Sequence, residues 1–200
     1  MNLQRPYAES CEQNQQVILQ ILQQVFTNPG RVLEIGSGTG QHVLFFSNHM
    51  PHLSWQPTDI VSQLEAIRMW MEDADHDRIQ SPRELDLRNT HWLIDQGYDY
   101  VFTANTTHIV SWPLVQAMFK GVAESLKSGG RFAQYGPFNY AGQYTSDSNA
   151  RFDSWLKDRD PDSGIRNFED LQVLAHSHGL ELQQDYAMPA NNRILVWRKV

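Results

Sequence analysis

A glycine-rich turn at residues 36–40 constrains this chain more than any other feature. Arg31 to Ile35 form a short apolar segment that predicts a β-strand, and Gly36, Gly38 and Gly40 follow it. Glycines at this spacing let the chain turn sharply from a strand into a helix and let a ligand approach the backbone closely. The alternative is a tight turn that binds nothing. Three glycines in five residues favour a nucleotide-type site, for which such a motif is typical.

Strands and helices alternate along most of the chain. Apolar residues at helical spacing predict a first helix that ends before Pro29-Gly30, with Ser10 and Gln13 as its capping box. Gly129-Gly130 is expected to close the helix that Pro113 opens. We expect strands at 31–35, 53–58, 83–87, 98–104 and 131–135, helices at 41–49, 62–75, from 113 and at 168–178, and an antiparallel strand pair at 180–187 and 193–199. This order predicts a doubly wound, mostly parallel α/β sheet.

Composition excludes several classes of protein. The length of 200 residues suits a single domain, 1–200. A formal charge of −7 makes the chain a poor binder of polyanions, so we expect no nucleic-acid partner. No apolar run reaches the roughly 18 residues of a membrane span, and the first thirty residues lack a secretion signal. We therefore expect a cytoplasmic protein with no membrane partner. No group of ligands has zinc spacing, so no metal site is expected.

Two residues at the glycine turn discriminate between nucleotide ligands. The dinucleotide fingerprint is G-x-G-x-x-G, and Gln41 stands where its third glycine should be. Glu34, two residues before Gly36, places a carboxylate that opposes a pyrophosphate but suits a cation. Both observations argue against a nicotinamide-dependent oxidoreductase. They favour S-adenosylmethionine, which carries a sulfonium and an amino group and has no phosphate.

The pattern E-x-G-x-G-x-G at residues 34–40 resembles the first motif of class I S-adenosylmethionine-dependent methyltransferases. Tyr98 to Phe102 and Leu126 to Phe132 resemble later landmarks of that family, in the right order. The resemblance implies a Rossmann-like three-layer sandwich whose seven-stranded, mostly parallel sheet has an antiparallel last strand. It implies that Asp59 accepts hydrogen bonds from the ribose hydroxyls and that Asp86 contacts the adenine amino group; their other readings are a turn aspartate and a surface carboxylate. The expected cofactor-binding residues are Glu34, Gly36, Ser37, Gly38, Thr39, Gly40, Asp59, Ile60, Asp86, Leu87 and Asn105.

A narrower resemblance covers nearly the whole chain. Six short segments together are similar to a family of small, uncharacterised methyltransferase-like proteins: residues 5–7, 35–42, 55–57, 135–138, 148–153 and 188–192. This likeness supports the same class of protein but implies no particular substrate.

The segment after the fourth strand lies beside the transferred methyl group in this fold. Asn105 is followed by Thr106-Thr107-His108, which differs from the motif of DNA and protein amide methylases. His108 is the candidate general base and Asn105 a candidate for holding cofactor or substrate. The alternative for both is a residue that only packs or hydrogen-bonds locally.

Two segments are expected to enclose the acceptor. Residues 1–28 form an N-terminal lid, and the irregular insertion 136–166, with 188–192, follows the fifth strand where open α/β sheets bind ligands. The insertion has nearly balanced charges, which suits a small polar acceptor rather than a phosphate backbone. The alternative is that its arginines pair with neighbouring aspartates and only tie the loop together. The expected substrate-binding residues are Arg5, Tyr7, Tyr135, Phe138, Asn149, Arg151, Arg166 and Asn191.

The sequence thus predicts an S-adenosylmethionine-dependent methyltransferase with a small-molecule acceptor. The alternative is a catalytically silent protein that keeps the cofactor site and regulates a partner. The acceptor, its methylated atom and the oligomeric state stay open.

Overall fold

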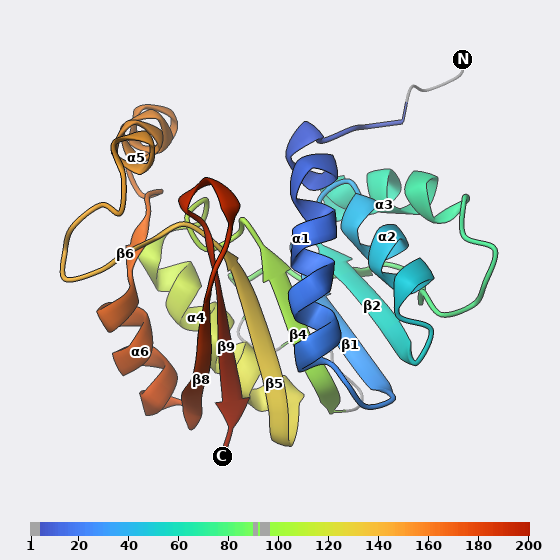
Figure 1. Ribbon diagram of the computed structural model, residues 1–200. Helices are drawn as coiled ribbons and strands as arrows, with labels where there is room; N and C mark the ends of the chain where they lie inside the picture. Colours follow the sequence, from blue (N-terminus) through green and yellow to red (C-terminus); the bar gives the residue numbers. More distant parts are fainter. Residues whose placement is uncertain (1–4, 90–91, 93–96) are drawn as a thin grey trace.

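The computed structural model describes residues 5–89, 92 and 97–200. Across the described residues, seven strands form one sheet in the order β3-β2-β1-β4-β5-β9-β8 (Figure 1). The strands are β1 (Gly30–Ile35), β2 (Leu53–Asp59), β3 (Arg83–Glu84), β4 (Tyr98–Ala104), β5 (Leu126–Gly136), β8 (Leu180–Ala187) and β9 (Arg193–Lys199). All pairs from β3 to β5 are parallel, and β9 is antiparallel to both β5 and β8. The predicted sheet, with its antiparallel strand pair, is confirmed.

Helices cover both faces of this sheet. α1 (Glu9–Val25), α2 (Gln41–His49) and α3 (Leu64–Met71) lie on one side, and α4 (Trp112–Ser125) and α6 (Phe168–Ser177) on the other. Two hydrophobic cores result, one around Phe46, Trp55 and Phe102 and one around Phe119 and Trp197, all fully buried. The structure is therefore a three-layer sandwich of the class I methyltransferase type, as predicted.

The parallel pairing brings several strand ends to one edge. Ile35 lies opposite both Thr58 and Thr103, and Ala104 lies opposite Tyr135. Because parallel strands end at the same edge, the segments after β1, β2, β4 and β5 meet there. The beginning of α1 and the insertion helix α5 (Asp147–Arg159) also lie at this end of the sheet, the upper end in Figure 1.

The insertion after β5 is ordered by short-range pairing. Its first strand, β6 (Phe138–Asn139), pairs in parallel with β7 (Arg166–Asn167), so the chain leaves and rejoins the domain side by side. Short 3-10 turns follow β2 and β8, at η1 (Val61–Gln63) and η2 (Pro189–Asn191). No helix in the described ranges is long and apolar enough to cross a membrane.

Several element boundaries differ from the prediction, and the helix expected at 62–75 is the shorter α3 at Leu64–Met71. α1 begins at Glu9, so Ser10 lies inside the helix and forms no cap; Ala8 N donates instead to the side-chain oxygen of Gln41, at 2.6 Å. α4 ends at Ser125 rather than at the glycines. Leu126 already pairs with β4, and a register shift leaves Gly129-Gly130 within the strand as a bulge.

The third strand is also shorter than predicted, because it ends at Glu84 instead of reaching residue 87. The carboxylate of Asp86 accepts a hydrogen bond from Arg88 N at 2.9 Å, and Asp86 O accepts one from Asn89 N at 2.9 Å. Such a side-chain-to-backbone turn competes with strand pairing.

Candidate cofactor and acceptor site

The three glycines of the turn share a left-handed backbone but differ in the space around them. Gly36, Gly38 and Gly40 have φ values of +71°, +58° and +89°. A Cβ on Gly36 would lie 2.6 Å from the Thr106 hydroxyl, and one on Gly40 would lie 2.9 Å from the Ile67 Cα. A Cβ on Gly38 would meet nothing within 4 Å. The outer two glycines therefore permit close packing, whereas the space above Gly38 is open to a ligand.

Asp59 lies at the end of β2 and faces this turn. One of its oxygens accepts a hydrogen bond from Gly38 N at 2.7 Å and the other from Ile60 N at 2.8 Å. Burial raises the pKa of Asp59, and the two backbone donors oppose that rise. Each carboxylate oxygen can accept more than one hydrogen bond, so the side chain can still take hydroxyl donors from a ligand.

Glu34 is a buried carboxylate at the end of β1, directly beneath the turn. Its side chain is 2% exposed, and its Oε2 is buried with no hydrogen-bond partner in the described part of the chain. Burial raises the pKa of Glu34 to about 7; the Ser37 side chain lowers it and the Asp59 carboxylate raises it further. A buried oxygen without a partner is costly, so a donor or cation above it would be stabilising.

The residues expected near adenine surround the ends of β2 and β3. Ile60 is 43% exposed, Leu87 is buried, and Asp86 is half-buried. The Arg88 guanidinium binds both oxygens of Asp86 and, with the Arg88 amide, lowers the pKa of that carboxyl. Asp86 is thus already engaged by a neighbour, and its role toward adenine stays a prediction.

Asn105 and His108 follow β4 and line a pocket. Asn105 adopts a left-handed backbone conformation, with φ +59°, and its backbone N–H donates to Tyr135 O at 3.0 Å. His108 is 4% exposed and packs edge-on against the Phe152 ring, with centroids 5.2 Å apart. Burial, helped by the positive charge of Arg166, lowers the pKa of His108 to about 4, so the imidazole is neutral at physiological pH.

The pocket beside these residues has a volume of about 970 Å³, within the range of small-molecule sites. Its walls come from the start of α1, the ends of β4 and β5, helix α5 and the η2 turn. The lining includes Ser10, Gln13, Asn14, Asn105, His108, Tyr135, Asn149, Phe152, Trp155, Arg159, Asp160, Ala190 and Asn192. The N-terminal segment 1–28 and the insertion 136–166 with 188–192, the two segments expected to enclose an acceptor, therefore both contribute residues to this pocket.

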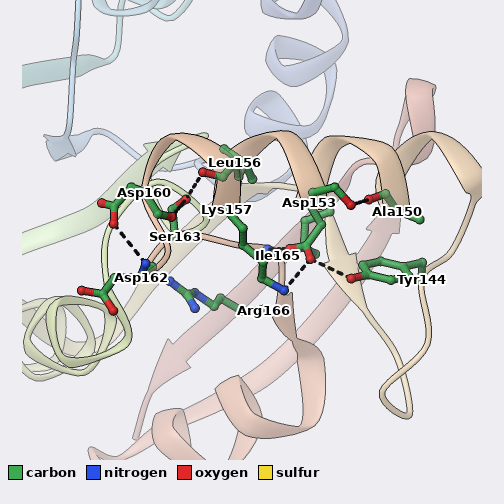
Figure 2. Close-up of polar contacts among 11 residues, drawn as sticks. Tyr144, Ala150, Asp153, Leu156, Lys157, Asp160, Asp162, Ser163, Ile165 and Arg166 are labelled. Atoms are coloured by element: carbon green, nitrogen blue, oxygen red, sulfur yellow. Dashed lines mark hydrogen bonds and ion pairs between the residues drawn. The ribbon is translucent and has the colours of Figure 1, made fainter.

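The insertion is held in place by one buried carboxylate. Asp153, 2% exposed, accepts hydrogen bonds from the Tyr144 hydroxyl, the Lys157 ammonium and Ile165 N, each at 2.6 Å (Figure 2). These partners come from the loop before α5, from α5 itself and from the chain after it. Asp153 thus fixes α5 on its neighbours and, with it, the wall that carries Phe152.

Six of the eight residues expected to bind the substrate lie outside the lining of the pocket: Arg5 and Tyr7 in the N-terminal segment, and Phe138, Arg151, Arg166 and Asn191. Arg151 is exposed, and Phe138 is buried in the core beside α4. Asn191 is exposed on the η2 turn, where its carbonyl accepts from Asn149 Nδ2 at 3.2 Å. Arg166 points toward Asp162 (Figure 2), and its guanidinium donates to the carbonyls of Val110 and Asp162, the latter at 2.8 Å.

The described part of the N-terminal segment binds α3 and the end of the glycine turn. The Arg5 guanidinium lies 3.7 Å from the centroid of the Trp70 ring and forms an ion pair with Asp73. The Trp70 indole donates to Pro6 O at 2.6 Å, and the Tyr7 hydroxyl bonds Glu12. Arg5 and Tyr7 thus lie near the turn rather than in the acceptor pocket.

Sequence reasoning missed a buried polar chain that joins the two halves of the site. His42, at the start of α2, contacts the Asn14 side chain at 2.7 Å, and Asn14 bonds the hydroxyl of Tyr135. Burial lowers the pKa of His42 to about 4. Asn14 and Tyr135 both line the pocket. The only local signal was a polar residue on the apolar face of the first helix.

No group of three or more side chains in the described ranges could hold a metal ion. The carboxyl edge of the sheet brings together the glycine turn, the carboxyl groups of Glu34 and Asp59, whose pKa values are raised, and the neutral His108 beside the pocket.

Comparison with solved structures places the fold among methyltransferases. An O-methyltransferase family protein from Burkholderia thailandensis aligns with a TM-score of 0.83 at 15% identity, over 96% of this chain and 57% of that one. The S-adenosylmethionine-dependent methyltransferase SibL aligns with a TM-score of 0.79 at 20% identity, over 95% and 55% of the two chains. Human N-acetylserotonin methyltransferase, solved with S-adenosylmethionine, gives 0.78 at 15% identity, over 96% and 53%. The chain thus spans little more than half the length of these structures, and such identities establish the fold alone.

A family model covers nearly the whole chain, at residues 5–199. On that match, together with the methyltransferase fold, the chain belongs to the family described as protein of unknown function DUF938.

Proposed function

We propose that this protein is an S-adenosylmethionine-dependent methyltransferase that acts on a small-molecule acceptor. The observation that carries the proposal is the contact between the glycine turn and the pocket wall. Gly36 packs against Thr106, and the residue before Thr106, Asn105, lines the pocket. A ligand over the turn and a second ligand in the pocket would therefore meet at one point.

The residues at the turn fit this cofactor. The unpartnered Oε2 of Glu34 suits the positive charge that a sulfonium and an amino group provide, and it would repel a pyrophosphate. The open space above Gly38 admits a ligand, and Asp59 at its side can accept hydroxyl hydrogens. The cofactor supplies an electrophilic methyl group on a positively charged sulfur. Ile60, Asp86 and Leu87 are the proposed adenine neighbours.

His108 and Asn105 are the proposed groups at the reacting end. A neutral imidazole could accept a hydrogen bond from the acceptor and take its proton as the acceptor bonds to the methyl carbon, while the carbon–sulfur bond breaks and S-adenosylhomocysteine leaves. The walls of the pocket exclude water from that point and hold the acceptor in line, which accounts for much of the rate in a displacement reaction. Arg166 positions this segment, because its guanidinium binds the carbonyls on either side of His108, those of Thr107 and Val110.

A second candidate function is a protein that binds the cofactor without turnover. One observation favours it: a histidine whose pKa has fallen to about 4 is a weak base. A concave pocket of small-molecule size beside the turn supports the enzyme instead, because a silent regulator needs no such cavity.

The test is methyl transfer to a fractionated metabolite extract, with labelled S-adenosylmethionine. The enzyme should label at least one small molecule. His108→Gln should lower that turnover by about 10²-fold or more while S-adenosylhomocysteine binds with unchanged affinity. Cofactor binding without label in any fraction would favour the silent protein, and unchanged turnover in His108→Gln would remove the histidine from the reaction.

A further inference from the structure

One wall of the pocket is a row of aromatic rings along α5. Phe152 and Trp155 stack with centroids 5.8 Å apart and planes 18° from parallel. The edge of Phe152 meets His108, and Arg159 lies over Trp155, 4.6 Å from its ring centroid. Trp155 lines the pocket yet is 49% exposed. An indole left so exposed in a concave site presents apolar surface that a flat ring would cover with favourable stacking or edge contacts.

The rest of the lining combines apolar side chains with uncharged polar ones. Its amide and hydroxyl side chains include Ser10, Gln13, Asn14, Asn105, Asn149 and Asn192. Amides and hydroxyls both donate and accept hydrogen bonds, so they can bind hydroxyl and carbonyl groups of a ligand in several orientations.

Charge is nearly absent from the described lining. Arg159 and Asp160 are its only members with a formal charge, they are adjacent and of opposite sign, and both are exposed. The carboxylate of Asp153 lies on α5 too, but it is engaged by Tyr144, Lys157 and Ile165. An ionised ligand would lose its hydration in this pocket without gaining a partner of opposite charge.

We propose that the pocket binds an uncharged, planar aromatic molecule bearing a hydroxyl group, with its ring against Phe152 and Trp155 and its hydroxyl toward His108. The neutral state of His108 supports this orientation, because an unprotonated ring nitrogen accepts a hydrogen bond from a hydroxyl. That the bound molecule is the methyl acceptor rests on the proposed function; the binding preference itself does not.

Four probes of one size separate the features of this ligand: 2-naphthol, its anionic analogue 2-naphthoate, the cationic 2-naphthylmethylammonium and the saturated decahydro-2-naphthol. Calorimetry with the full chain, with and without S-adenosylhomocysteine, should show 2-naphthol binding at least about tenfold tighter than each of the others. Equal affinity for decahydro-2-naphthol, tighter binding of a charged probe, or no measurable binding of 2-naphthol would each overturn the proposal.

Variants then locate the binding. Trp155→Leu should weaken 2-naphthol about tenfold, whereas the matched Trp155→Phe keeps a ring and should stay within about threefold of wild type. Phe152→Leu removes the other aromatic ring and should also weaken the binding of 2-naphthol. An unchanged affinity in both leucine variants would place the ligand elsewhere and refute the proposal.

S-adenosylhomocysteine binding distinguishes this inference from the proposed function. If S-adenosylhomocysteine binds and 2-naphthol does not, the ligand class is wrong and the cofactor site stands. If 2-naphthol binds with the predicted preference and S-adenosylhomocysteine does not, the methyltransferase proposal fails and the pocket's preference stands.

Discussion

Replacing Glu34 with glutamine should stabilise the protein above neutral pH and weaken its binding of a cationic cofactor. The carboxyl of Glu34 has its pKa raised from 4.5 to about 7 by burial. The folded state therefore binds the proton more tightly than the unfolded chain does. Stability contributed by the protonated carboxyl is fully present below pH 4.5 and is lost as the pH rises through about 7.

The size of the effect follows from the shift. A pKa change from 4.5 to about 7 corresponds to about 3 kcal/mol between the two protonation states. About 2–3 kcal/mol of this is lost between pH 5 and pH 8, because the unfolded chain is already mostly ionised at pH 5. Glutamine has nearly the same shape and does not titrate, so it lacks this loss.

The assay is urea unfolding of wild type and Glu34→Gln at pH 5 and pH 8. The variant's stability relative to wild type should be more favourable at pH 8 than at pH 5 by about 2–3 kcal/mol. Asp59 titrates in both proteins, so the comparison removes its own contribution and leaves only its coupling to Glu34. A relative stability that is the same at both pH values would refute the assignment of a buried, raised carboxyl to Glu34.

Ligand binding gives the second half of this prediction. A cation above Glu34 stabilises the carboxylate, so the Glu34 carboxyl should lose its proton when S-adenosylmethionine binds near pH 7. The Glu34→Gln variant should release fewer protons on binding and should bind S-adenosylmethionine more weakly. Calorimetry in two buffers of different ionisation enthalpy measures the proton count. Equal proton release in wild type and variant would mean that the cofactor does not contact this carboxylate.

Three further perturbations test other parts of the site. Gly38→Ala should cost only about 1 kcal/mol of backbone strain yet abolish cofactor binding. Gly40→Ala should destabilise the fold far more, because its Cβ would meet the backbone of α3. Urea unfolding measures the loss of stability, and titration with S-adenosylhomocysteine measures the loss of binding. Asp153→Ala should destabilise by about 2–4 kcal/mol and expose the insertion to limited proteolysis, whereas the exposed Asp158→Ala should do neither. Arg5→Ala should weaken cofactor binding severalfold with little change in melting temperature, since it removes one cation–π contact between the N-terminal segment and Trp70. An unchanged affinity would mean that the N-terminal segment has no role at the site.

The sequence predicts the sheet and the cofactor turn because both depend on local patterns. The end of a buried strand, the glycines that follow it and the carboxylate after the next strand are each recognised from a few neighbouring residues. These patterns predict that Glu34, Gly38 and Asp59 lie at one edge of the sheet, and in the structure Gly38 N donates to Asp59. The predicted start of the first helix was wrong because a distant contact decides it. α1 begins at Glu9 because Ala8 binds the side chain of Gln41, which lies 33 residues away.

The acceptor half of the site was less predictable, since its contacts join segments far apart in the chain. Arg166 was expected either to contact an acceptor or to pair with aspartate side chains. It donates instead to the carbonyls of Thr107 and Val110, 59 and 56 residues earlier. The contact between Asn14 and His42 spans 28 residues and depends on how α1 lies across the sheet. No short motif encodes that placement.

The claim that the glycine turn binds S-adenosylmethionine is tested most directly by calorimetric titration with S-adenosylhomocysteine and with NAD. We predict that S-adenosylhomocysteine binds one-to-one and NAD does not. Asp59→Ala should weaken the binding about tenfold or more, because it removes a charged acceptor of about 1.5–3 kcal/mol. Binding of NAD tighter than S-adenosylhomocysteine, or an unchanged affinity in Asp59→Ala, would contradict the account.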